Sequence, residues 1–227
     1  MPYICTKFKR MRYSLWIFSL CLSVFFVACD KSDNKSETYS RIAVTHAAHG
    51  TPGLDVILDG VVMNSDSLVY GQSAPYTFIF SGQRTFRLNK AGTAINYSAK
   101  DTFFDAEAFY SVFASDSAQK MKALLLKDDL SAPAAGKAHV RLLHLVPNAP
   151  AIDIMNDTTH VLNAIAYNTA QSFLPITAGT YQFKAVLTGT MDSVYQTDNL
   201  VLQDGKIYTC YLRSSATGIS HALIQHN

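Results

Sequence analysis

Two stretches of sixteen residues decide the fold: RIAVTHAAHGTPGLDV at residues 41–56 and HVRLLHLVPNAPAIDI at residues 139–154. Each begins with apolar residues two positions apart, reaches a histidine, crosses a loop that contains proline and ends around an aspartate. The stretches are 98 residues apart, and this offset relates further pairs along the chain. The pairs are His46 and His144, Asp55 and Asp153, Tyr110 and Tyr208, and Leu125-Leu126 and Leu223-Ile224. One offset held over this length indicates a duplicated domain.

The duplication sets the domain boundaries. We expect repeat 1 at residues 41–130 and repeat 2 at residues 138–227, with a linker at residues 131–137. The linker contains Pro133, Gly136 and several small residues, a composition typical of connections between folded segments. Each repeat has about 90 residues, which is enough for one modest hydrophobic core.

Apolar residues recur at every second position in both repeats, as in half-buried strands. Examples are Ile42/Val44, Phe78/Phe80, Phe86/Leu88 and Tyr181/Phe183/Ala185/Leu187. Turn signals separate the runs, among them Asp59-Gly60, Ser81-Gly82, Ala178-Gly179 and Asp204-Gly205. Met121–Asp128 fits either a helical turn or a strand, since its counterpart Ile219–Gln225 has a strand pattern. We therefore predict an all-β protein with two tandem antiparallel β-sandwich domains.

Tyr110 and Tyr208 favour the immunoglobulin-like type of sandwich. Each opens a late strand just after a turn, the position of a tyrosine corner, in which the hydroxyl bonds back across that turn. The pair of cysteines and the core tryptophan of antibody domains are missing, since the one tryptophan, Trp16, lies near the N-terminus. We expect the architecture of that sandwich without the antibody hallmarks.

The N-terminal segment has the features of an export signal. Four basic residues, Lys7, Lys9, Arg10 and Arg12, precede an apolar run over residues 13–28, which is short for a membrane-spanning helix. The run ends in Phe26-Val27-Ala28-Cys29, which resembles a lipobox in the loose form of Bacteroidetes lipoproteins. The resemblance implies a signal peptide at residues 1–28, cleavage between Ala28 and Cys29, lipid on Cys29 and a polar tether at residues 29–40. An uncleaved anchor or an ordinary secretory signal remains the alternative.

Removal of this leader changes the charge of the chain. The precursor has 19 basic and 17 acidic residues, and the leader takes four basic ones, which leaves 15 − 17 = −2. A slightly acidic mature chain gives no basic surface for nucleic acid. Cys5 and Cys21 leave with the leader and Cys29 carries the lipid, so Cys210 has no intramolecular partner for a disulfide.

Repeat 2 resembles the DUF4397 family. Residues 139–154 are similar to the family's opening, typically VRVVHASPDAPAVDVYVDG, and FLPITAGTYQF at residues 173–183 is similar to its LPAGTYTV strand. The resemblance covers nearly all of residues 138–213, whereas repeat 1 is a divergent match around residues 45–60. It implies a small β-domain of secreted and envelope proteins, often in tandem, and it implies no activity.

His46, His144, Asp55 and Asp153 are the candidates for chemistry or for ligand binding. A histidine at a strand end serves as a metal ligand or general base, or it ties down the following loop through hydrogen bonds, and a duplicated scaffold favours the structural role. Asp59, Asn64, Asp66, Asn156 and Asp157 match no recognised calcium loop. The chain has no G-x-S-x-G motif and no cluster of cysteine with histidine. We therefore expect no catalytic residues, no metal and no cofactor.

Tyrosines near predicted turns offer a contact surface, or they pack at the rim between sheets. They are Tyr70, Tyr76, Tyr97 and Tyr167. We expect a non-catalytic binding or assembly lipoprotein of the cell envelope, anchored to a membrane, most simply the outer one, with an envelope protein or a glycan as partner. The alternatives are a carbohydrate-binding accessory lipoprotein and a hydrolase that uses histidine and aspartate.

Overall fold

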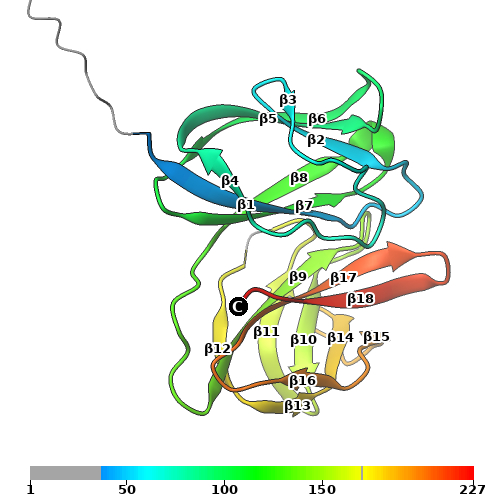
Figure 1. The fold of residues 1–227 in the computed structure, drawn as a ribbon. Coiled ribbons are helices and arrows are strands. Elements are labelled where there is room, and N and C mark those ends of the chain that lie inside the picture. The colour runs from blue at the N-terminus through cyan, green and yellow to red at the C-terminus, as the bar shows by residue number, and fades with distance from the viewer. Residues whose placement is uncertain (1–36, 170) are drawn as a thin grey trace, which may run out of the picture. The chain divides into compact units, whose positions relative to one another are not determined.

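A computed structural model describes residues 37–169 and 171–227. Residues Glu37–Asn227 form one compact unit, built from strands and a single turn of 3-10 helix at Ala118–Lys120 (Figure 1). Within the described residues, no helix is both long enough and apolar enough to span a bilayer.

Repeat 1 consists of eight strands in two sheets. The strands are β1 (Tyr39–His46), β2 (Leu54–Leu58), β3 (Val61–Val62), β4 (Thr77–Phe80), β5 (Gly82–Lys90), β6 (Asn96–Phe104), β7 (Phe109–Ser115) and β8 (Lys122–Asp128). One sheet has the order β4-β1-β7-β8 and the other has the order β3-β2-β5-β6.

Repeat 2 repeats this arrangement. Its strands are β9 (Lys137–Leu145), β10 (Ile152–Asn156), β11 (Thr159–Ile165), β12 (Leu174–Thr177), β13 (Gly179–Tyr181), β14 (Phe183–Leu187), β15 (Ser193–Gln196), β16 (Leu200–Leu202), β17 (Ile207–Ser215) and β18 (Gly218–Gln225). The sheets are β12-β9-β17-β18, β11-β10-β14-β15 and the short ribbon β13-β16.

The prediction of an all-β protein with two tandem β-sandwiches is confirmed, with three local differences. Lys122–Asp128 is a strand, so the alternative of a helical turn is wrong. The first strand begins at Tyr39, inside the segment assigned to the tether, because Tyr39 and Ser40 already pair with β4. One pair of strands in each repeat is parallel, β1 with β7 and β9 with β17, since an alternating pattern carries no information about strand direction.

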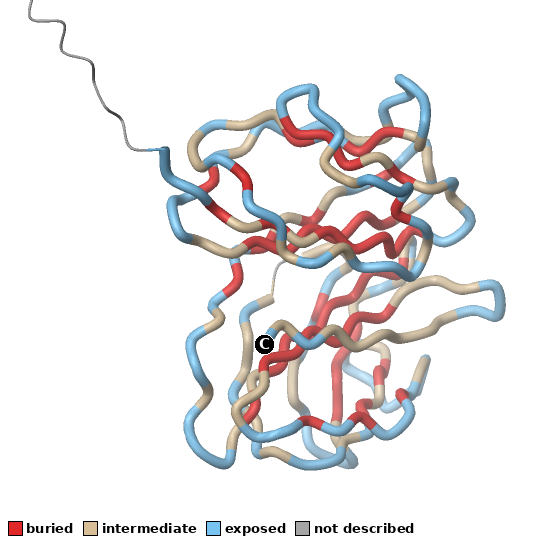
Figure 2. Tube along the Cα trace, in the orientation of Figure 1, coloured by how far each residue is buried: buried red, intermediate tan, exposed pale blue. Residues whose placement is uncertain are grey.

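Each sandwich encloses its own core. Buried residues follow the strands of the facing sheets in both repeats (Figure 2). Members of the core of repeat 1 include Val44, Leu54, Leu88, Phe104 and Val112, and those of repeat 2 include Val140, Ile154, Phe183, Leu202 and Cys210. Full burial of a large apolar side chain contributes about 1.5–3 kcal/mol.

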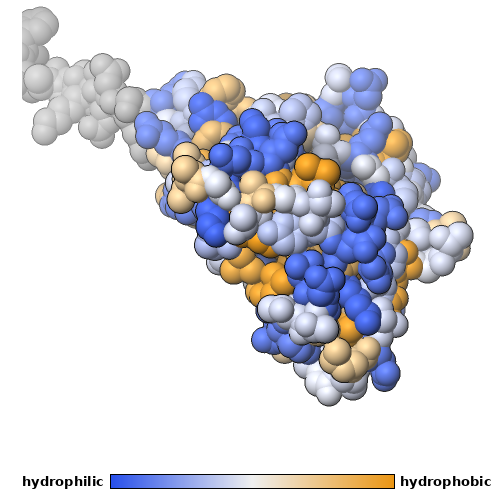
Figure 3. Space-filling model, turned by 90° about the horizontal axis from the view of Figure 1, so that it is seen from below, coloured by the Kyte–Doolittle hydropathy of each residue, from blue (hydrophilic) through white to orange (hydrophobic). Residues whose placement is uncertain are grey.

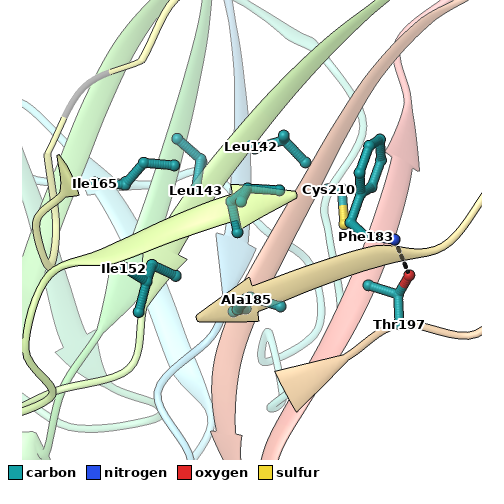
Figure 4. A pocket seen from close by; sticks show the side chains of 10 residues that line it. Leu142, Leu143, Ile152, Ile165, Phe183, Ala185, Thr197 and Cys210 are labelled. Carbon is teal, nitrogen blue, oxygen red and sulfur yellow. Dashed lines mark hydrogen bonds between the residues drawn. The ribbon is translucent and has the colours of Figure 1, made fainter. Parts of the chain in front are cut away.

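The interior of repeat 2 contains a small apolar cavity that Cys210 lines (Figure 4). Its volume of about 10 Å³ has room for one water at most, so we assign it to core packing. Burial raises the pKa of the Cys210 thiol to about 12, which keeps it protonated and unreactive at neutral pH. Nearby, the Thr197 hydroxyl accepts a 3.0 Å hydrogen bond from the backbone N–H of Phe183.

A third apolar cluster joins the outer faces of sheets β4-β1-β7-β8 and β12-β9-β17-β18, and we call this contact the inter-repeat seam. Eight of its nine members pair at the 98-residue offset: Ala47 with Leu145, Phe113 with Tyr211, Leu124 with Ala222, and Leu126 with Ile224. The ninth, Leu143, has Thr45 as its counterpart. The rings of Phe113 and Tyr211 meet edge to face, with centroids 5.4 Å apart. Equivalent residues facing each other form an isologous interface, as in a two-fold dimer.

Candidate functional site

His46 and His144 hold equivalent loops in the same way. The Nδ1 of His46 accepts from the N–H of Ala48 at 3.3 Å, and its Nε2 lies 3.1 Å from the carbonyl of Pro52. In repeat 2, His144 bonds to the N–H of Val146 at 3.4 Å and to the carbonyl of Pro150 at 3.2 Å. The loop amide fixes the tautomer, so Nε2 carries the proton and donates it to the carbonyl. Burial lowers the pKa of both imidazoles, which keeps them neutral at physiological pH.

Asp55 and Asp153 bind backbone amides of neighbouring strands and turns. The carboxylate of Asp55 accepts from the N–H of Gly92 at 2.8 Å. That of Asp153 accepts from the N–H of Ala164 at 2.7 Å and from Gly189 at 3.3 Å. These hydrogen bonds, led by the one from Ala164, lower the pKa of Asp153. The carboxylates fix loop geometry.

Tyr110 and Tyr208 both form the corner that the sequence predicts. The Tyr110 hydroxyl accepts from the N–H of Asp105 at 2.9 Å and donates to the Asp105 carboxylate at 3.1 Å. The Tyr208 hydroxyl accepts only from the N–H of Gln203, at 3.2 Å. Each donor is five residues upstream of its tyrosine, so the two corners are equivalent.

The structure does not bring the candidate histidines and aspartates together into a catalytic or metal site. Within residues 37–169 and 171–227, neither His46 nor His144 has a hydrogen bond or ion pair with a carboxylate. The same residues contain no group of three His, Cys, Asp or Glu side chains arranged to hold a metal. Of the calcium candidates, Asn64 bonds to the backbone of Val56 and Leu54, and Asp59 to that of Thr85.

The turn tyrosines are half-buried, which favours the alternative that they pack at the rim between sheets. The Tyr70 hydroxyl donates to the carbonyl of Ser214 at 2.6 Å, from repeat 1 to repeat 2. The Tyr167 hydroxyl reaches in the opposite direction, 3.3 Å from the carboxylate of Asp116, the counterpart of Ser214. The two tyrosines therefore make reciprocal contacts across the seam. Tyr97 packs against the core of repeat 1.

The sequence did not predict a buried ion pair that lies beside the seam. Arg141 Nη1 donates to the Asp128 carboxylate at 2.7 Å, and the two side chains are 1% and 0% exposed. Asp128 also accepts from the hydroxyls of Tyr76 and Ser111, at 2.7 and 2.6 Å. Arg141 Nε donates to Thr209 at 3.1 Å. Three hydroxyl groups around the pair offset part of the cost of burying two charges, and Arg141 Nη2 has no hydrogen-bond partner within the described residues.

His226 completes this network in its neutral form. Its Nε2 lies 2.8 Å from the Thr209 hydroxyl, and its Nδ1 lies 2.9 Å from the Tyr76 hydroxyl. Because the Tyr76 hydroxyl donates to Asp128, it accepts from Nδ1–H, and Thr209 donates to Nε2. Burial lowers the pKa of His226 to about 4. His226 and Asp128 are counterparts at the 98-residue offset, as are Thr209 and Ser111.

Two clefts lie where residues of both repeats meet. The larger, of about 360 Å³, is lined by Leu125, Leu126, Lys127, Asp129, His139, Arg141, Gln171, Ser172 and Phe173. The other, of about 300 Å³, is lined by Ala47, His49, Asp116, Ser117, Lys120, Pro147, Asn148 and Ser214. Seen from below, the surface of the molecule shows apolar side chains as separate small groups among polar ones (Figure 3).

Repeat 1 also displays an aromatic–arginine patch, which we define as Tyr39, Arg41, Phe78, Phe80 and Arg84. Tyr39, Phe78 and Phe80 are 42%, 60% and 45% exposed. The alternating pattern predicts that Phe78 and Phe80 lie on the buried face of their strand. This prediction is wrong, because Ile79 between them enters the core at 3% exposure. Three apolar residues in a row leave the phase of the alternation undecided.

The predicted lipidation and cleavage sites lie outside the described residues. They are Cys29 and the Ala28–Cys29 bond, together with the signal peptide at 1–28 and most of the tether at 29–40.

Comparison with known proteins adds a family. No curated protein matches the chain. A solved structure described as "Alpha-glucan binding by a streptococcal virulence factor" shares 12% identity with a TM-score of 0.24, over 81% of this chain and 96% of that one. A TM-score this low supports no conclusion about the fold of this chain. The family model described as "Domain of unknown function (DUF4397)" matches residues 40–155 and again residues 138–227. The chain therefore belongs to the DUF4397 family.

Proposed function

We propose that the protein is an exported lipoprotein of the cell envelope, held at a membrane by lipid on Cys29, which acts by binding rather than by catalysis. The observation that carries the non-catalytic part of this proposal is the hydrogen bonding of His46 and His144. A general base needs a ring nitrogen free to take a proton from a substrate, and both nitrogens of each ring are bonded to loop backbone. Asp55 and Asp153 are engaged in the same way.

The inter-repeat seam supports a binding role because it makes one body of the two repeats. Six large side chains of the seam are buried, and burying them contributes on the order of 10 kcal/mol before any opposing cost is subtracted. The Asp128–Arg141 pair adds fixed geometry at the same contact. Surfaces on both repeats are thus presented in a constant arrangement, which lowers the entropic cost of engaging a partner.

A hydrolase gains no support from this geometry, and the glycan alternative loses its original motivation. Tyr70 and Tyr167 use their hydroxyls across the seam, and Tyr76 uses its own on Asp128 and His226. A glycan partner would have to use other surfaces, such as the 360 Å³ cleft.

The anchor is tested by mass spectrometry of the protein purified from the membranes of its own cells. We expect a chain that begins at Cys29 and carries acyl groups on that residue, and we expect Cys29→Ser to accumulate as the uncleaved precursor. A mature chain that begins elsewhere, or that carries no lipid, would reject the anchor.

Binding is tested by photo-crosslinking in intact cells. A photoreactive residue at Gln171, which lines the 360 Å³ cleft, should give a discrete adduct. The matched control carries the photoreactive residue at Thr217, which is exposed in the β17–β18 turn, and should give no adduct. Turnover of an envelope substrate by the purified protein, abolished in a folded His144→Gln variant, would overturn the non-catalytic assignment.

A further inference from the structure

The aromatic–arginine patch is built as a surface feature. Arg41 lies over the ring of Phe78 with its guanidinium carbon 4.4 Å from the centroid, and Tyr39 meets Phe78 edge to face at 6.3 Å. Arg84 lies over Phe80 at 5.7 Å, and the rings of Tyr39 and Phe80 are 5.1 Å apart. These contacts order the side chains relative to one another while leaving them in solvent.

Packing within the fold does not explain the patch. Tyr39, Arg41, Phe78 and Phe80 point outward from the sheet that forms the seam, at the end of that sheet that repeat 2 leaves exposed. Arg84 reaches Phe80 from β5 of the other sheet. The strand pairings give the counterparts in repeat 2: Lys137 for Tyr39, His139 for Arg41, Pro175 for Phe78 and Thr177 for Phe80. The duplicated scaffold therefore does not require aromatic residues at these positions.

The patch lies where the chain enters the fold. Tyr39 is the first residue of β1 and comes ten positions after Cys29, so the two lie within about 36 Å of each other even at full extension. Any membrane to which Cys29 is anchored is within reach of this end of repeat 1.

The chemistry of the patch fits a lipid headgroup region. Tyrosine favours the membrane–water interface, and phenylalanine enters the boundary between headgroups and acyl chains. A guanidinium pairs with phosphate while its stem remains in apolar surroundings. The acidic neighbours are already engaged, since Glu37 accepts from the Tyr39 hydroxyl and Asp59 pairs with Arg84 at 3.3 Å. Arg41 has no ion pair within the described part of the chain.

We propose that the patch rests on the lipid surface of the membrane that holds Cys29, with Phe78 and Phe80 at headgroup depth and Arg41 on a lipid phosphate. This inference rests on the proposed anchor. Two exposed phenylalanines give weak membrane affinity by themselves, and the short tether raises the effective concentration of lipid at the patch. The contact would set the orientation of the whole body on the membrane.

Tryptophan fluorescence tests this contact directly, because residues 29–227 contain no tryptophan. Phe80→Trp places one reporter in the patch, and Val62→Trp, on an exposed position of β3 at 50% exposure, is the matched control. Residues 29–227 include the whole compact unit and are coupled through Cys29 to a maleimide lipid in phosphatidylethanolamine–phosphatidylglycerol vesicles. Cys210 is 2% exposed and should not react.

We expect the emission of Phe80→Trp to shift to shorter wavelength on vesicles and to be quenched by brominated lipid, with no change for Val62→Trp. Adding Arg41→Glu should reduce the shift. Equal responses of the two reporters, or none from either, would overturn the proposal. A concentration-dependent shift without vesicles would instead indicate a second copy of the chain, and loss of the quenching on addition of oligosaccharides would indicate a glycan; each outcome rejects the lipid surface.

Chemical coupling makes this result independent of lipidation in the cell. If the vesicle experiment succeeds and native Cys29 carries no lipid, the proposed function fails and the affinity of the patch for lipid remains. If native Cys29 is lipidated and the reporters do not respond, only the patch proposal fails.

Discussion

The two repeats share an inner scaffold and differ on one outer surface. Both have the histidine loop clamp, the aspartate at the hairpin and the tyrosine corner, in equivalent geometry. On the outer face of the first strand and its edge neighbour, repeat 1 has Tyr39, Arg41, Phe78 and Phe80, where repeat 2 has Lys137, His139, Pro175 and Thr177. Residues that both copies keep explain the fold, and residues that one copy alone has are where function is to be sought.

The seam shows a second kind of difference, in which equivalent positions became complementary. Asp128 and His226 occupy matching positions of the two repeats and belong to the same hydrogen-bond network. Asp128 is a buried anion in it, whereas His226 is neutral and both donates and accepts a hydrogen bond. Arg141, the cation of the pair, corresponds to Ala43 in repeat 1. A fused pair can diverge in this way, whereas two identical chains cannot.

The largest effect should come from removing one charge of the seam. Asp128→Ala leaves Arg141 buried without its anion and should lower the free energy of unfolding by about 3–5 kcal/mol. The matched control is Asp129→Ala, one residue further along and exposed, which should have little effect. Urea unfolding measures both, and equal small losses would show that the pair does not hold the repeats together.

The next effect is a dependence of stability on pH to which His226 contributes. The folded pKa of His226 is about 4, below the unfolded value of about 6.5, so the unfolded state binds more protons between these values. Stability from this group is complete above pH 6.5 and is lost as the pH falls towards 4, by about 2–3 kcal/mol. His226→Gln should flatten the curve of unfolding free energy against pH in this range. The exposed His49→Gln should not, and an unchanged curve for His226→Gln would contradict the neutral assignment.

The tyrosine corners should differ by a smaller amount. Tyr110→Phe removes two hydrogen bonds and should cost about 1–2 kcal/mol, whereas Tyr208→Phe removes one and should cost about 1 kcal/mol or less. Paired urea denaturation curves of the two variants measure the difference. A larger loss for Tyr208→Phe would contradict the expected contribution of the second hydrogen bond of Tyr110.

The smallest effect on stability should be at the patch. Phe78→Ser with Phe80→Ser should change the free energy of unfolding by less than about 0.5 kcal/mol, because both side chains are in solvent. Ile79→Ala on the same strand removes a buried side chain and should cost about 2–5 kcal/mol. A serine pair as damaging as Ile79→Ala would make the patch a part of the fold.

The sequence predicts the features that depend on local pattern and repetition. The 98-residue offset locates both histidines, both aspartates and both corners. The histidines and the corners bond to residues within six positions of themselves, whereas Asp55 and Asp153 also reach partners 37 and 36 residues away. The seam depends on partners about 100 residues away, and the alternating pattern does not say what covers the second face of a strand. A signal was nevertheless present, since Tyr110–Ala114 and Leu124–Leu126 offer apolar residues to both faces. The position of the patch could not be predicted, because Phe78, Ile79 and Phe80 are all apolar.

Cleavage of the connection between the repeats tests the central claim, that the two sandwiches form one body through equivalent faces. A protease recognition sequence placed between Asp128 and Lys137, where no strand runs, allows the chain to be cut after folding. We predict that the cut protein elutes from a gel-filtration column at the volume of the intact chain, and that Asp128→Ala weakens this association. Two separate fragments, each eluting at half the size, would contradict the account.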